Sequence, residues 1–233
     1  MVVGNKVEKQ GKNFSHFLMQ YSVYRMCRCY IGKFAMFLRK RLFSNETVDY
    51  SRTITAHERL ELVVQLDNSL TELIRSIDGL ETQQLYLKRK SNHWSIADCI
   101  EHVTLAELYF DVIRNTALEG TSSAEQQTIR RIKDSTIRTK MLSRIWRAKS
   151  PEVFQPTCRF KDVDEALEIL KQERTKLRAY VETTQDDMRH LYWYHPLTGQ
   201  IDLYQTLLLL SAHLERHVYQ IKKIKRLHSI QAN

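Results

Sequence analysis

Apolar residues recur every three or four positions along four long stretches of this chain, which places them on one face of a helix. The stretches cover residues 55–77, 95–118, 163–183 and 202–227. Only 6 Gly and 3 Pro occur in 233 residues, so little interrupts these helices. We find no alternating strand pattern of useful length. The sequence therefore predicts an all-α four-helix bundle.

Local signals support two of the predicted helix starts. Ser95, followed three residues later by Asp98, resembles a capping box at the start of the second helix. Asp162 or Asp164 can cap the third helix.

A long connection, residues 121–161, joins the second and third helices. A connection of this length allows two neighbouring helices of a bundle to run parallel. Within it, residues 124–149 are basic and carry the apolar spacing of a short helix. The apolar side of that helix would be Ile132, Ile137, Met141, Ile145 and Trp146.

The first 50 residues differ from the rest of the chain in charge. They hold nine Lys or Arg and three acidic residues, so they supply +6 of the net charge of +9. We interpret residues 1–50 as a basic, poorly ordered N-terminal extension and residues 51–233 as the bundle domain. Two further interpretations stay open: the extension faintly resembles a mitochondrial presequence, or translation starts near Met36.

Charge and cysteine usage indicate a cytoplasmic protein without a nucleic-acid or membrane partner. Residues 51–233 carry only +3, and no recognised reading motif accompanies the basic run in residues 130–147. No uncharged apolar run reaches the length of about 18 residues that a membrane span requires. The four cysteines, Cys27, Cys29, Cys99 and Cys158, have no spacing typical of a disulfide framework.

Three histidines lie beside the predicted apolar stripes. His213 and His217, in AHLERH, are one turn apart on the fourth helix, and His102, in IEHVTLAE, lies on the second. Three neutral imidazoles with an open fourth position form a typical catalytic zinc-type site. The alternative is three ordinary histidines that bond to backbone or water, and spacing alone leaves both interpretations open.

AHLERH differs from the zincin helix motif, because Leu214 stands where a catalytic Glu would follow the first His. Glu215 points away from the ligand face, so we expect it to be solvated and predict no peptidase activity. Cys99 shares a face with His102, and we expect a small core residue there in preference to a fourth ligand. Further candidates for the mouth of a pocket are His93, His195, Tyr109 and Glu107.

Two longer motifs resemble the DinB-like superfamily of helical metalloproteins. NHWSIADCIEHVTLAE carries His102, and HPLTGQIDLYQTLLLLSAHLERHVYQI carries His213 and His217. The resemblance covers residues 52–228. It implies a four-helix bundle in which these three histidines bind a divalent metal ion, zinc or nickel, since neutral imidazole suits either.

Characterised members of that superfamily include thiol-dependent transferases and isomerases that use low-molecular-weight thiols. A metal ion with an open position lowers the pKa of a bound water or thiol. We therefore expect a metal-dependent transferase or hydrolase that activates a thiol or water for reaction with a small molecule. The alternative is a non-catalytic metal-binding or interaction bundle. The sequence assigns no catalytic residue, and it is compatible with a homodimer.

Overall fold

The computed structural model describes residues 53–120, 132–143, 149–195 and 198–228. The chain divides into two units, Met1–Val48 and Asp49–Asn233, and every described residue belongs to the second. The predicted N-terminal extension therefore lies outside the described residues. Among the described helices, none has both the length and the apolar character needed to cross a bilayer.

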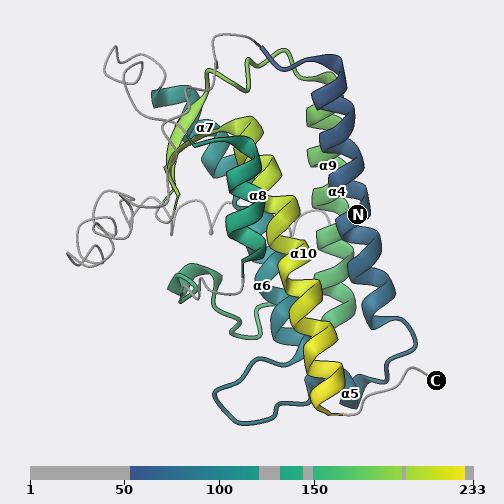
Figure 1. The fold of residues 1–233 in the computed structure, drawn as a ribbon. Helices are drawn as coiled ribbons and strands as arrows, with labels where there is room; N and C mark the ends of the chain where they lie inside the picture. Colours follow the sequence, from purple (N-terminus) through teal and green to yellow (C-terminus); the bar gives the residue numbers. More distant parts are fainter. Residues whose placement is uncertain (1–52, 121–131, 144–148, 196–197, 229–233) are drawn as a thin grey trace, which may run out of the picture. The chain divides into compact units, whose positions relative to one another are not determined.

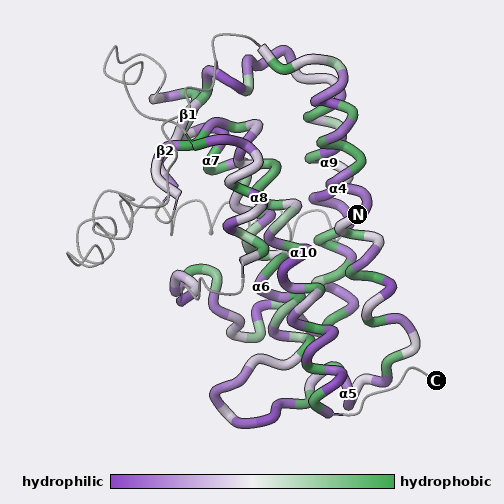
Figure 2. The backbone as a smooth tube through the Cα atoms, in the orientation of Figure 1, coloured by the Kyte–Doolittle hydropathy of each residue, from purple (hydrophilic) through white to green (hydrophobic). Residues whose placement is uncertain are grey.

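Four long helices form the bundle, which confirms the predicted fold class (Figure 1). Helix α10 packs against α4 and α6, and α9 packs against the same two. The consecutive helices α4 and α6 therefore occupy diagonal positions. Figure 2 shows hydrophilic and apolar segments alternating along each helix, as expected when one face of each helix is buried. The four helices are α4 (Ala56–Ile77), α6 (Ile96–Leu108), α9 (Val163–Thr183) and α10 (Leu203–Leu227).

Helices α6 and α9 run parallel, an arrangement that the length of their connection allows. The hydroxyl of Thr104 donates to the carbonyl of Ala166, and further along both helices Glu107 pairs with Arg174. In both contacts a higher residue number on α6 goes with a higher residue number on α9, so the two helices point in the same direction. Part of the connection forms a short helix, α8 (Asp134–Leu142), which packs against α10.

The second predicted helix is divided in two. Its hydrogen-bonding pattern is interrupted at Tyr109, and α7 (Phe110–Gly120) follows. The two segments contact different partners, because α6 packs against α9 and α10 whereas α7 packs against a β-strand. Two short helices were not predicted, α5 (Thr82–Tyr86) and the 3₁₀ turn η2 (Glu152–Phe154).

A two-stranded antiparallel hairpin, which the sequence did not predict, precedes α10. Strand β1 (Tyr192–His195) pairs with β2 (Gly199–Asp202), with His195 opposite Gly199. Each strand has only four residues, which is too short for a period-two pattern to stand out. Gly199 adopts φ 84°, a left-handed conformation that favours glycine.

Each long helix begins with a side-chain cap. Thr55, Ser95, Asp162 and Asp202 each accept a hydrogen bond from the backbone N–H three residues further on. The capping box at Ser95 and the cap at Asp162 are confirmed. These caps fix where α6 and α10 start, and so fix which residues reach the bundle interior.

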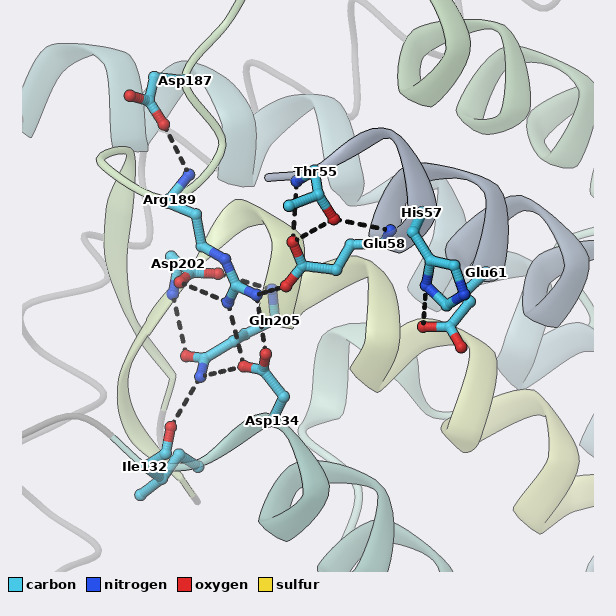
Figure 3. Close-up of polar contacts among 10 residues, drawn as sticks. All are labelled: Thr55, His57, Glu58, Glu61, Ile132, Asp134, Asp187, Arg189, Asp202 and Gln205. Atoms are coloured by element: carbon cyan, nitrogen blue, oxygen red, sulfur yellow. Dashed lines mark hydrogen bonds and ion pairs between the residues drawn. The ribbon is translucent and has the colours of Figure 1, made fainter. Parts of the chain in front are cut away.

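Arg189 joins the starts of three helices through one buried guanidinium (Figure 3). Its Nη2 lies 3.1 Å from Glu58 and 2.8 Å from Asp134, and its Nη1 lies 3.4 Å from Asp202. These carboxylates stand at the first turns of α4 and α8 and at the cap of α10. The guanidinium also lies 4.0 Å from the ring centroid of Tyr204. This ion-pair network sets the position of the α10 N-terminus.

Three carboxylates around one guanidinium leave an excess of negative charge. Burial raises the pKa of Asp202 from 3.8 to about 7, and Arg189 opposes that shift. The folded protein therefore keeps a proton on this carboxyl between about pH 4 and pH 7, where the unfolded chain has released it.

We predict that Leu73→Ala lowers the free energy of unfolding by about 3 kcal/mol, because truncation of a fully buried leucine leaves a cavity. Leu60 lies on the same helix and is 63% exposed. Leu60→Ala should change stability by less than about 0.5 kcal/mol. Urea denaturation of both variants checks this, and equal losses would contradict the packing of α4.

We also predict that Asp202→Asn gains stability relative to the wild type as the pH rises from 4 to 7. Asparagine keeps the helix cap. In the wild type, each pH unit in this window lowers stability by at most about 1.4 kcal/mol, because only the unfolded state releases the proton. Urea denaturation across this range, with the exposed Asp164→Asn as control, measures the difference. A difference that stays constant with pH would contradict the raised pKa.

Candidate metal centre

Side chains from α6 and α10 bring the three candidate histidines together. Nε2 of His213 lies 3.1 Å from Nε2 of His102 and 3.1 Å from Nε2 of His217. All three candidate ligand atoms lie within 4.8 Å of one another. Within the described ranges of the chain, no carboxylate or thiol joins this cluster. The set is therefore all imidazole, three nitrogen donors from two helices.

The tautomer of His102 follows from its backbone contact. Its Nδ1 lies 2.8 Å from the carbonyl oxygen of Phe154, in the segment that precedes α9. A carbonyl can only accept, so Nδ1 carries the proton and Nε2 presents a lone pair to the other two rings. This is the form in which an imidazole binds a metal ion through Nε2.

The cluster cannot satisfy all its nitrogens with hydrogen bonds of its own. If Nε2 of His213 carries a proton, it can donate to His102 or to His217, and the other contact has no hydrogen bond. If it carries none, it faces the lone pair of His102 directly. Every assignment of neutral rings leaves one buried contact unsatisfied, which costs free energy. A cation among the three Nε2 atoms would satisfy them together, so the residues fit a bound metal ion.

Burial keeps the three rings neutral. It lowers the pKa of His102, although the Phe154 carbonyl opposes this shift. It lowers the pKa values of His213 and His217 well below 6.5, and His102 and Arg216 add to both shifts. A neutral imidazole is the ligand form, so no proton has to be removed before a metal ion binds near neutral pH.

Aromatic side chains cover part of the cluster. The ring of Trp94, which precedes α6, lies 4.8 Å from that of His102 and stacks on that of His217 at 6.0 Å. The ring of Phe154 packs edge-on against Tyr109 at 5.2 Å. Tyr109, a candidate for the pocket mouth, is therefore connected to the segment that contacts His102.

The other candidate residues lie elsewhere. Glu107 is buried in the bundle and its Oε1 lies 2.6 Å from Nη2 of Arg174, so it is a core ion pair and not part of a pocket mouth. Burial raises the pKa of the Glu107 carboxyl, and Arg174 opposes this. Cys99 is fully buried in the core, as predicted, and burial raises the pKa of its thiol. His93 is exposed.

Two polar residues near the ends of the motifs have defined partners. Glu215 pairs with Arg138 of α8 at 2.7 Å. This partly exposed ion pair joins α8 to α10. Nδ1 of His195 accepts a hydrogen bond from the backbone N–H of Thr198 at 3.2 Å. Burial lowers the pKa of His195 to about 4, and this residue interacts electrostatically with His213.

We predict that, in metal-free protein, the rings of His213 and His217 titrate with midpoints well below pH 6.5. The unfolded chain takes up these protons near pH 6.5 and the folded chain does not, so stability should fall as the pH drops through that value. NMR titration of the ring C–H signals measures the midpoints. A midpoint at or above 6.5 would contradict the buried, neutral cluster.

Comparisons with known proteins agree with this architecture. The family model of the DinB superfamily matches residues 65–221. A solved structure, YfiT from Bacillus subtilis, is described as a probable metal-dependent hydrolase with an unusual four-helix bundle topology. It superposes with a TM-score of 0.50 and 14% sequence identity, over 81% of this chain and 95% of that one. Comparison with curated proteins gives no match. The chain belongs to the DinB superfamily.

Proposed function

We propose that this protein is a metal-dependent enzyme that binds one divalent ion through His102, His213 and His217. The observation that carries the proposal is the convergence of three Nε2 atoms that cannot all make full hydrogen bonds with one another. The description of YfiT as a probable metal-dependent hydrolase supports it.

The reaction we propose is transfer or hydrolysis of a small molecule, with a thiol or water as nucleophile. An ion held on three neutral imidazoles lowers the pKa of a bound water or thiol and polarises a carbonyl. The surrounding residues of the chain supply positioning: the Phe154 carbonyl orients His102, and Trp94 covers one side of the rings. Zinc and nickel both suit this ligand set. We also propose that the co-substrate is a low-molecular-weight thiol. The same proposal places the protein in the cytoplasm, as a homodimer.

One feature favours a second candidate, a metal-binding bundle without catalysis. Within the described residues, the cluster includes no Asp, Glu or Cys that could act as a general base. A hydrolase of this kind would rely on the ion itself to activate the nucleophile. Metal-loaded protein that binds no exogenous ligand at the ion would favour this candidate over the enzyme.

We predict that zinc or nickel binds with one ion per chain and raises the free energy of unfolding, by about 2.7 kcal/mol at a free concentration of 100 times Kd. His213→Ala removes the nitrogen that contacts both others, so it should abolish this stabilisation. His190→Ala removes an exposed imidazole that pairs with Asp187 and serves as the matched control. Elemental analysis and thermal unfolding measure both effects.

Activity screens with thiol acceptors and with hydrolysable esters and amides then test the enzyme. Activity that depends on added metal and is lost in His213→Ala supports the proposal. Wild-type protein that contains no stoichiometric metal and gains none from either ion would refute it.

A further inference from the structure

Glu101, the residue before His102, has a buried carboxylate that binds three consecutive backbone N–H groups. Its Oε1 accepts from Thr157 at 2.9 Å and from Arg159 at 3.0 Å, and its Oε2 accepts from Cys158 at 3.1 Å. The side chain is 7% exposed. A charged group so deeply buried is stable only when several donors surround it, and here all are backbone groups of one segment.

Residues 157–159, which donate to this carboxylate, include an unusual backbone conformation at Cys158. Cys158 has φ 57°, in the left-handed region that favours glycine, and it has no glycine on either side. Successive N–H groups that converge on one point form an anion-binding concavity. The carboxylate of Glu101 fills that concavity, which makes it the anchor of residues 157–159.

The same segment supplies the carbonyl that orients His102. Phe154 lies three residues before Thr157, and its carbonyl accepts the Nδ1 proton of His102 at 2.8 Å. The side chain of Gln155 donates to the carbonyl of Ser150 at 2.6 Å, which closes the turn around η2. Two consecutive residues of α6 therefore hold one segment: Glu101 at its far end and His102 at its near end.

We propose that Glu101 is a positioning residue for the metal centre, and this inference rests on the proposed function. By anchoring residues 157–159, its carboxylate keeps the Phe154 carbonyl opposite Nδ1 of His102. That contact holds the proton on Nδ1 and leaves the Nε2 lone pair for the ion. The contacts of the Glu101 carboxylate are with the backbone of residues 157–159, so its effect on the metal centre passes through this segment.

The test compares Glu101→Gln with Glu173→Gln. Glutamine has the size of glutamate, but it places an NH₂ group against backbone N–H donors. Glu173 matches Glu101 in burial, at 8% exposed, and it lies on α9, where it pairs with Lys176. The control therefore removes one buried carboxylate without touching residues 157–159. Glu101→Asp, which keeps the charge with a shorter reach, serves if Glu101→Gln does not fold.

The first measurements use metal-free protein. We expect amide hydrogen exchange of residues 157–159 to be at least about tenfold faster in Glu101→Gln, because an NH₂ group replaces one of the two acceptor oxygens and faces a backbone N–H donor. Ring ¹⁵N shifts should show His102 only as the Nδ1–H tautomer in the wild type and as a mixture of tautomers in the variant. Glu173→Gln should match the wild type in both. An unchanged tautomer despite faster exchange would overturn the proposal, since Glu101 would then anchor only the segment.

The second measurement is zinc affinity in competition with a chelator. Loss of a residue that orients a ligand typically weakens metal binding by about 10–100-fold, and we expect this for Glu101→Gln but not for Glu173→Gln. Equal affinities in both variants would also overturn the inference. If the wild type binds no zinc or nickel, the proposed function fails by itself, and the exchange and tautomer data still decide whether Glu101 sets the state of His102.

Discussion

The contact among three buried imidazole nitrogens is the constraint on which the rest of this structure depends. Neutral rings at 3.1 Å need a hydrogen in each contact, and one hydrogen is always missing. The bundle nevertheless places these rings where burial lowers their pKa values and excludes the charged form. Such a cluster is less favourable without a ligand than around a cation, which is the physical basis of the proposal that it binds a metal ion.

The arrangement of helices serves this cluster. The long connection allows α6 and α9 to run parallel, and it also carries the segment that contacts α6. The network around Arg189 fixes the N-terminus of α10, the helix that carries His213 and His217. The position of the site therefore depends on an ion-pair network in another part of the bundle, and on a backbone carbonyl outside it.

Much of this was predictable from the sequence because it depends on local periodicity. Helical spacing identified the four long helices, and it placed His213 and His217 on one side of the last. The capping box at Ser95 gave the start of α6. The meeting of His102 with that pair was an expectation that spacing alone left open, and it required the resemblance to a known family.

The features that were missed depend on backbone groups and tertiary contacts. Phe154 acts through its carbonyl, which no side chain reveals, and the β1–β2 hairpin is too short for a period to appear. Glu107 was a candidate for the pocket mouth because it belongs to the motif that carries His102, but it is buried in the bundle, where Arg174 makes its burial tolerable. The sequence signal for Glu101 is an acidic residue directly before the candidate ligand His102, at the border of the predicted apolar stripe.

X-ray absorption spectroscopy at the edge of the bound metal tests the central claim most directly. We expect three imidazole nitrogens at about 2.0–2.1 Å from the ion, with the remaining position held by a ligand that the chain does not supply. A first coordination shell that contains protein sulfur, or fewer than three imidazoles, would contradict the account.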